Sequence, residues 1–133
     1  MKTVLADTSF YVAVLNPADA LHRAASVWSQ ETSLKVVVTE FVLVELANFL
    51  ADSPQRQRLG NLVQYLRNNS HTIVVPVSTT LLDRGLDLFT HRPDKSWSLT
   101  DCISFQVMED YGLSEALTAD HHFKQAGFTA LLR

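Results

Sequence analysis

The amino-acid sequence predicts an α/β fold of three layers, with a mainly parallel central sheet of about five strands flanked by helices. Short β-branched or apolar runs alternate with segments of helical periodicity along the chain. The runs lack the polar alternation of strands with one solvent-facing side, so both faces of the sheet are expected to be buried. Strands that alternate with helices are typical of a parallel sheet with helices on both faces.

The expected strands are short, and each is rich in Val, Ile, Leu, Ala or Thr. In chain order they comprise residues 3–6, 35–39, 72–77, 116–119 and, as the weakest pattern, 129–132. Between them, apolar residues recur at i, i+3, i+4 and i+7, which predicts amphipathic helices. Three segments show this spacing, beginning at Leu21, Leu59 and Leu82. Gly112 and Gly127 stand where helices are expected to end.

Length and composition predict one domain over residues 1–133, because 47% hydrophobic and 19% charged residues suit a chain with its own core. No apolar stretch approaches the ~20 residues of a membrane helix, so no membrane partner is expected. Asp7 interrupts the apolar N-terminal run, which argues against a signal peptide. The single cysteine, Cys102, cannot form an internal disulfide, which favours a cytoplasmic location. It is expected to be a small core residue.

Two acids stand directly at the ends of expected strands. Asp7 comes after the first strand and Asp120 after the fourth. Open parallel sheets place functional sites at the carboxyl ends of their strands, so the two carboxylates would meet if these strands are neighbours. Each acid could instead be an ordinary helix N-cap, because helix-like sequence follows both.

Two further acids share helix faces with apolar residues. Glu45 is one of only two polar residues between 41 and 50, a pattern that predicts a buried helix. A buried carboxylate requires a cation or strong donors, although a salt bridge or a surface position would also explain it. Asp101 forms a Ser-x-x-Asp capping-box pattern with Ser98, yet it shares a helix face with Phe105.

Four carboxylates in one place repel one another, and a divalent cation is the simplest means of holding them together. Oxygen ligands suit Mg²⁺ or Mn²⁺, and such sites serve phosphodiester hydrolysis. The net charge of −3 argues against a nucleic-acid binder, but it becomes +1 without these four acids. Basic residues are candidates for contact with an RNA backbone, although each alone suits an ordinary solvated surface: Arg56, Arg58, Arg84, Arg92 and Lys95.

Four motifs occur in a fixed order: Asp-Thr-Ser at 7–9, Val-Leu-Val-Glu-Leu-Ala-Asn at 42–48, Ser-Leu-Thr-Asp-Cys-Ile-Ser-Phe at 98–105 and Leu-Thr-Ala-Asp-His-His-Phe at 117–123. On these motifs the chain resembles the PIN-domain family, and its layout is similar to VapC-type toxin ribonucleases. The resemblance implies a Rossmann-like PIN fold, a Mg²⁺ or Mn²⁺ site, RNA cleavage, a homodimer and a cognate antitoxin. It assigns metal binding and catalysis to Asp7, Glu45, Asp101 and Asp120, with Ser9 and Thr118 in support.

Other readings of the sequence remain open at this point. A PIN nuclease outside any toxin system and a catalytically silent α/β binding module are the main alternatives. A phosphatase is disfavoured because Asp7 lacks the second acid of an Asp-x-Asp pair. The adjacent His121 and His122 lack zinc-helix spacing, so they are expected to be surface or cap-region residues. The apolar segments 10–15 and 41–50 either form a partner surface or simply pack on the sheet.

Overall fold

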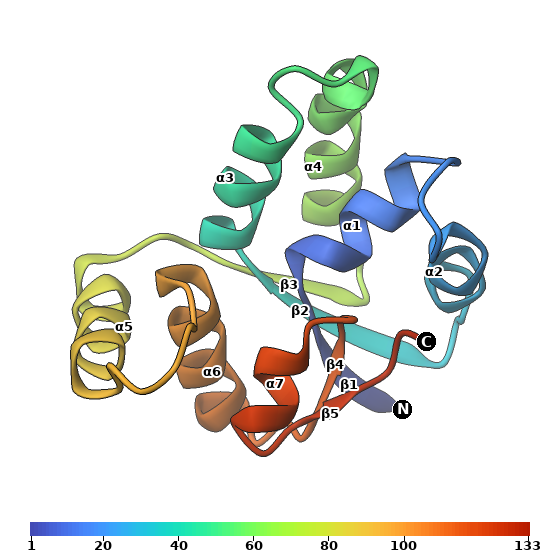
Figure 1. Cartoon of the computed structure of the whole chain (residues 1–133). Coiled ribbons are helices and arrows are strands. Elements are labelled where there is room, and N and C mark those ends of the chain that lie inside the picture. The colour runs from blue at the N-terminus through green and yellow to red at the C-terminus, as the bar shows by residue number, and fades with distance from the viewer.

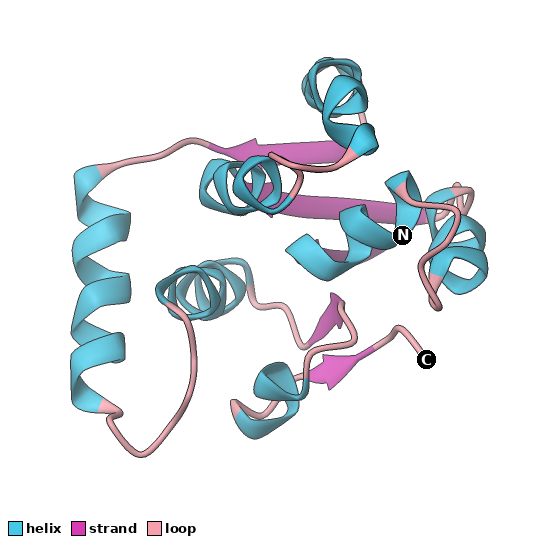
Figure 2. Cartoon of the chain, turned by 45° about the horizontal axis from the view of Figure 1, so that its top comes forward, coloured by secondary structure: helices cyan, strands magenta, loops and turns pink.

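A computed structural model describes all residues from 1 to 133, and it contains one sheet of five parallel strands in the order β3-β2-β1-β4-β5. The predicted fold class is confirmed. Figure 2 shows the strands side by side, with helices around them. The strands are β1 (Lys2–Ala6), β2 (Leu34–Thr39), β3 (Thr72–Val75), β4 (Glu115–Leu117) and β5 (Thr129–Ala130).

Helices cover both faces of the sheet and divide the core into two parts. Side chains of α1, α2, α3 and α4 pack on one face, around Val4 and Val38. Those of α5, α6 and α7 pack on the other, around Leu5 and Val37 (Figure 1). None of these helices combines the length and the apolar character that a membrane span requires. The helices are α1 (Thr8–Leu15), α2 (His22–Ser29), α3 (Glu40–Phe49), η1 (Pro54–Arg58), α4 (Leu59–Asn68), α5 (Thr79–His91), α6 (Leu99–Tyr111) and α7 (His121–Gln125).

Three strands are shorter than the sequence predicted. Strand β3 ends at Val75 because Pro76 follows, and proline has no N–H to donate to a neighbouring strand. Strand β4 ends at Leu117, where the N–H of Thr118 turns back to the carbonyl of Ala116 at 3.0 Å. Strand β5 contains only residues 129 and 130. The prediction that Asp120 ends a strand is therefore wrong, since a short loop separates it from β4.

The apolar sequence of α3 predicted a helix that is buried on all sides, and this prediction is wrong. Val42 and Leu46 are fully buried, but Val44 is 55% exposed and Phe49 is 66% exposed. The helix therefore packs on the sheet with one face and presents apolar side chains on the other. Helix α1, by contrast, is buried on most of its surface, because most of its residues lie in the core.

Helices α5 and α6 approach each other closely at Gly85. A Cβ atom at this position would lie 2.3 Å from Cγ1 of the buried Ile103, so only glycine fits without displacement. Gly112 ends α6 in the left-handed conformation, with a φ of 65°. These two positions fix the path of α6, whose first turn carries Asp101.

The strand order reverses at β1. From β1 the chain adds β2 and β3 on one side, and later returns to add β4 and β5 on the other. Ala6 of β1 pairs in register with Leu117 of β4, and the N–H of Asp7 donates to the carbonyl of Leu117 at 3.2 Å. Such a switch point opens a crevice at the carboxyl ends of the strands, and Asp7 lies there.

Candidate active site

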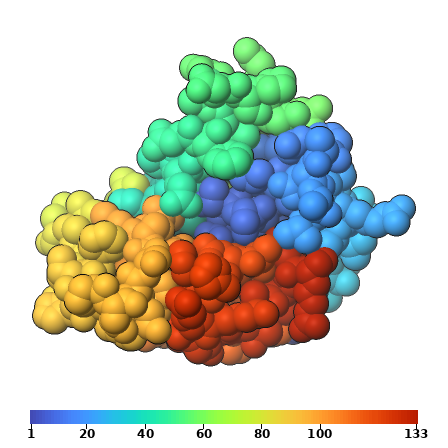
Figure 3. All heavy atoms as spheres, viewed as in Figure 1, coloured from blue at the N-terminus to red at the C-terminus, as the bar shows by residue number.

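The four acids of the sequence motifs line one pocket at this switch point. The pocket has a volume of about 400 Å³. Figure 3 shows a hollow in this region, where dark-blue atoms of the N-terminal segment lie between α3 and α7. The structure thus brings together residues from four separate motifs. The lining consists of Asp7, Thr8, Ser9, Val12, Asp19, Leu21, Glu45, Phe49, Ser98, Asp101, Asp120 and His122.

Asp7 is the most deeply buried of these acids, with 4% of its surface exposed. Its Oδ2 accepts hydrogen bonds from the hydroxyls of Thr118 at 2.9 Å and Ser9 at 3.3 Å. Asp7 occupies the N-cap position of α1, but its side chain makes no capping bond, so the alternative of an ordinary N-cap does not apply to it. Burial raises the pKa of Asp7 to about 6, against the bond from Thr118, which lowers it.

Glu45 reaches the pocket from α3. The helix starts at a capping Thr39, whose Oγ1 accepts from the N–H of Val42 at 3.1 Å. One and a half turns later, the Glu45 carboxylate accepts a hydrogen bond from the Thr8 hydroxyl. No Lys or Arg pairs with it, so the alternative of a structural salt bridge does not apply.

Asp101 lies in the first turn of α6, where the predicted capping box is present. Its N–H donates to Oγ of Ser98 at 3.0 Å, and its Oδ2 accepts from the Ser98 N–H at 3.1 Å. The residue is 5% exposed, and burial raises the pKa of its carboxyl group. The capping box thereby fixes a buried carboxylate in the pocket, so the structural and functional readings are compatible.

Asp120 caps the short helix α7, since its Oδ1 accepts from the N–H of His122 at 2.9 Å.

The sequence did not reveal His122 as a residue of the site. Its side chain is only 17% exposed, and Nδ1 lies 3.0 Å from Oδ2 of Asp101 and 3.3 Å from Oδ1 of Asp120. Of the two histidines predicted at the surface or in a cap region, His121 is at the surface with its side chain 73% exposed, and His122 lies in the cap region of α7 but turns inward. Asp19 is a fifth acid on the pocket that the motifs did not reveal.

The donor set of the pocket fits a hard divalent cation. Asp7, Asp101 and Glu45 contribute carboxylate oxygens, and neither Lys nor Arg occurs among the lining residues to neutralise them. The hydrogen bonds to Asp101 go to Oδ2 and those to Asp120 go to Oδ1. The second oxygen of each carboxylate therefore has no hydrogen-bond partner within the protein, which leaves it for a ligand in the pocket.

The five basic residues proposed for RNA contact lie outside this pocket. Arg84 forms a bidentate pair with Asp110, at 2.7 and 2.9 Å, and Arg92 pairs with Asp94. Arg58 donates to the carbonyl of Leu15 at the end of α1, and Arg56 donates to the carbonyl of Ala51. Each of these four guanidinium groups therefore already donates at least one hydrogen bond within the protein. An RNA-binding role for these residues and for Lys95 stays a prediction.

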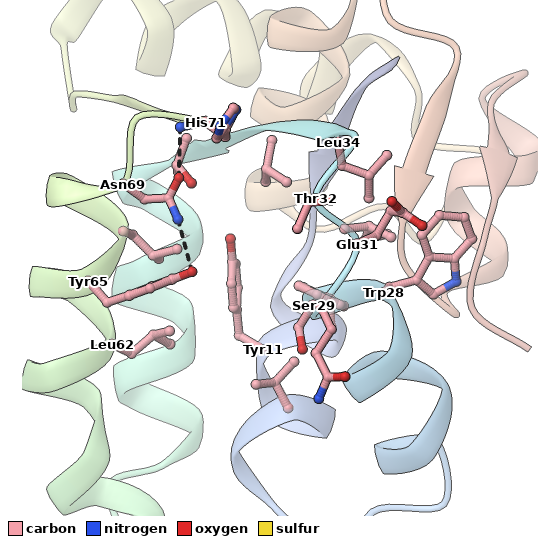
Figure 4. Close-up of a pocket in the computed structure, with 17 residues that line it drawn as sticks. Tyr11, Trp28, Ser29, Glu31, Thr32, Leu34, Leu62, Tyr65, Asn69 and His71 are labelled. Carbon is pink, nitrogen blue, oxygen red and sulfur yellow. Dashed lines mark hydrogen bonds between the residues drawn. The ribbon is translucent and has the colours of Figure 1, made fainter. Parts of the chain in front are cut away.

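A second pocket of about 430 Å³ lies between α1, α2 and α4, and it shares no residue with the acidic one. Figure 4 shows Tyr11 between Leu62 and Tyr65 of α4 and the segment that follows Trp28. The Tyr11 hydroxyl is buried without a hydrogen-bond partner, and burial raises its pKa. Ten of the seventeen lining residues are hydrophobic, so this pocket suits an apolar occupant rather than an ion.

The model of the PIN domain matches residues 4–129, and these residues include all four acidic motifs. This chain belongs to the PIN-domain family. The predicted resemblance is thereby confirmed. A curated relative from Mycobacterium tuberculosis, the 23S rRNA-specific endonuclease VapC20, is 27% identical over 126 residues, which cover 94% of this chain and 95% of the relative.

Solved structures support the same assignment of the PIN fold. The crystal structure of M. tuberculosis VapC20, described as a sarcin-ricin loop cleaving toxin, matches with a TM-score of 0.84 at 25% identity over 98% of this chain and 99% of that chain. VapBC2 from Rickettsia felis bound to a promoter DNA fragment gives 0.64 at 14% identity, over 98% and 97% of the two chains. FitAcB from Neisseria gonorrhoeae gives 0.62 at 16% identity, over 100% and 97%. The last two show the fold alone.

Proposed function

We propose that this PIN-domain chain is a metal-dependent endoribonuclease and the toxin of a toxin–antitoxin pair. The observation that carries the proposal is the pocket at the switch point, where four carboxylates meet without a Lys or Arg. A fold that buries Asp7 and Asp101 here without a Lys or Arg beside them loses stability, which is understandable if the acids bind a cation. The full-length similarity to a 23S rRNA-specific endonuclease supports RNA as the substrate.

The residues divide the work by position. Asp7, Glu45, Asp101 and Asp120 would hold Mg²⁺ or Mn²⁺, which, when bound, offsets phosphate charge and increases the acidity of water. Thr118 and Ser9 hold the Asp7 carboxylate in one orientation, and Thr8 does the same for Glu45. We propose that a carboxylate of the pocket accepts a proton from the attacking water.

The purified chain should cleave RNA only in the presence of Mg²⁺ or Mn²⁺. Isolated ribosomes are the first substrate to test, because the relative acts on 23S rRNA. Addition of EDTA should stop cleavage, and excess Mn²⁺ should restore it, as sequencing of the RNA ends would measure. Cleavage that continues undiminished in EDTA would contradict metal dependence. Tight Mn²⁺ binding without cleavage of any RNA would favour a silent binding module instead.

We also propose that the apolar pocket between α1, α2 and α4 receives the antitoxin. An unpartnered buried hydroxyl costs about 1–3 kcal/mol, and a polar group of a bound segment would satisfy that of Tyr11. Trp28 and Tyr65 supply the aromatic surface that protein interfaces favour.

A homodimer is proposed separately, on α5, where Leu86 and Phe89 lie one turn apart and are 39% and 45% exposed.

Tyr65→Glu should weaken binding of the proposed antitoxin by roughly tenfold or more, because it places a charge in the apolar pocket. Tyr65 is 60% exposed, so the fold should tolerate the change. Titration calorimetry would measure the dissociation constant. Tyr111→Glu is the matched control, since Tyr111 is 45% exposed and lines neither pocket. Equal binding by the Tyr65 variant and the wild-type chain would place the partner elsewhere.

A further inference from the structure

We propose that His122 is a positioning residue of the metal site. Its imidazole donates a hydrogen bond to Asp101, lies close to Asp120, and would hold both carboxylates so that their remaining oxygens are free to bind a cation. The inference rests on the proposed function, because it concerns the same pocket. It adds a hydrogen-bond donor, the imidazole N–H, to a site that the sequence motifs describe by its acids alone.

His122 links two elements that have no other polar connection at the pocket. Asp101 belongs to α6, and Asp120 precedes α7. Nδ1 of His122 lies 3.0 Å from Oδ2 of Asp101 and 3.3 Å from Oδ1 of Asp120. Since carboxylate oxygens only accept hydrogen bonds, Nδ1 is the atom that carries the proton between them. Nδ1 thus donates to Asp101 and lies close to Asp120, and its N–H dipole reduces the repulsion between the two acids.

The imidazole is held in place from two sides. The N–H of His122 donates to Oδ1 of Asp120 at 2.9 Å, which fixes the start of α7. The next residue, Phe123, is fully buried and packs edge-on against Phe105 of α6, with ring centroids 5.0 Å apart. Phe105 lies one turn after Asp101 on the same helix face. Consecutive residues of α7 therefore contact consecutive turns of α6, so the imidazole has little freedom to leave Asp101.

The position of the donor determines which oxygens remain available. The N–H of Ser98 and Nδ1 of His122 both donate to Oδ2 of Asp101, which leaves Oδ1 without a partner in the protein. At Asp120 the backbone N–H of His122 donates to Oδ1, which leaves Oδ2 without a partner in the protein. Groups that orient metal ligands by hydrogen bonds commonly raise metal affinity by roughly 10–100-fold. We infer a contribution of this size for His122.

The test compares two variants of the full chain in which an amide side chain replaces His122. Their Mn²⁺ affinity is measured without RNA, from the electron paramagnetic resonance signal of free Mn²⁺. His122→Asn retains a donor at the Nδ1 position, because Nδ2 of asparagine is equally distant along the side chain. His122→Gln places its donor at the Nε2 position instead. We expect the glutamine variant to lose affinity by roughly 10–100-fold, and the asparagine variant to stay within about threefold of wild type.

His91→Gln serves as the matched control and should bind Mn²⁺ like wild type, because the His91 side chain is 75% exposed on α5 and outside the pocket. Thermal unfolding of each variant without metal separates loss of affinity from loss of fold, and His122→Ala provides a further variant without any donor. Wild-type affinity in the glutamine or alanine variant overturns the inference while the proposed function stands. Equal loss in asparagine and glutamine overturns the assignment to Nδ1. A wild-type chain that binds no Mn²⁺ overturns the proposed function, and the inference with it.

Discussion

Replacement of Asp7 by Asn should lower RNA cleavage by a factor on the order of 10³, because a neutral amide cannot replace a charged ligand at the centre of the proposed metal site. The amide oxygen can still accept the hydrogen bond that Thr118 donates to Oδ2, so the fold should persist. The rate of cleavage of 23S rRNA at saturating Mn²⁺ would measure the loss. Expression of the wild-type chain should arrest growth of the host, and expression of this variant should not.

Asp94→Asn is the matched control for this experiment. Asp94 lies outside the pocket and pairs with Arg92 at 3.0 Å, so its loss should leave cleavage within about twofold of wild type. If Asp7→Asn cleaves as rapidly as wild type with added Mn²⁺, the assignment of Asp7 is wrong. If both variants lose activity equally, the effect does not belong to the pocket.

The stability of the metal-free chain should fall as the pH rises from about 4 to 7. Burial raises the pKa of Asp7 from 3.8 to about 6, so the folded chain retains a proton that the unfolded chain has already released in this range. A raised pKa stabilises the fold fully below pH 4, and this contribution disappears as the pH passes 6. The loss is about 2–3 kcal/mol, since each pKa unit corresponds to about 1.4 kcal/mol. Asp101, whose pKa burial also raises, acts in the same direction.

Urea unfolding in EDTA at several pH values, with Asp7→Asn as the reference, isolates this contribution. The variant and the wild type should be equally stable near pH 4, and the variant should be more stable by about 2 kcal/mol near pH 7. Added Mn²⁺ should reverse the order at pH 7, because it binds the folded wild type more tightly. An equal difference between the two proteins at every pH would show that Asp7 does not titrate as its burial requires.

Local patterns in the sequence predicted the fold class, the five strands and most helices. Short apolar runs and helical periodicity depend on neighbouring residues, so a single sequence reveals them. The ends of β3, β4 and β5 were placed too late, because the last residues of an apolar run leave the sheet when a proline or a turn ends the pairing. The exposed face of α3 was missed for a related reason, since hydrophobicity does not show whether a partner covers a residue.

The sequence by itself determined the acids at 7, 45, 101 and 120 and the motif order that identifies the PIN domain. Only the tertiary structure decided that β1 and β4 are neighbours, which brings Asp7 and Asp120 to one pocket. It also turned His122 inward, although its neighbour His121 is exposed. Two adjacent histidines look alike in a sequence. The capping bond of α7 and the packing of Phe123 against Phe105 set which one faces Asp101, and both depend on contacts between distant segments.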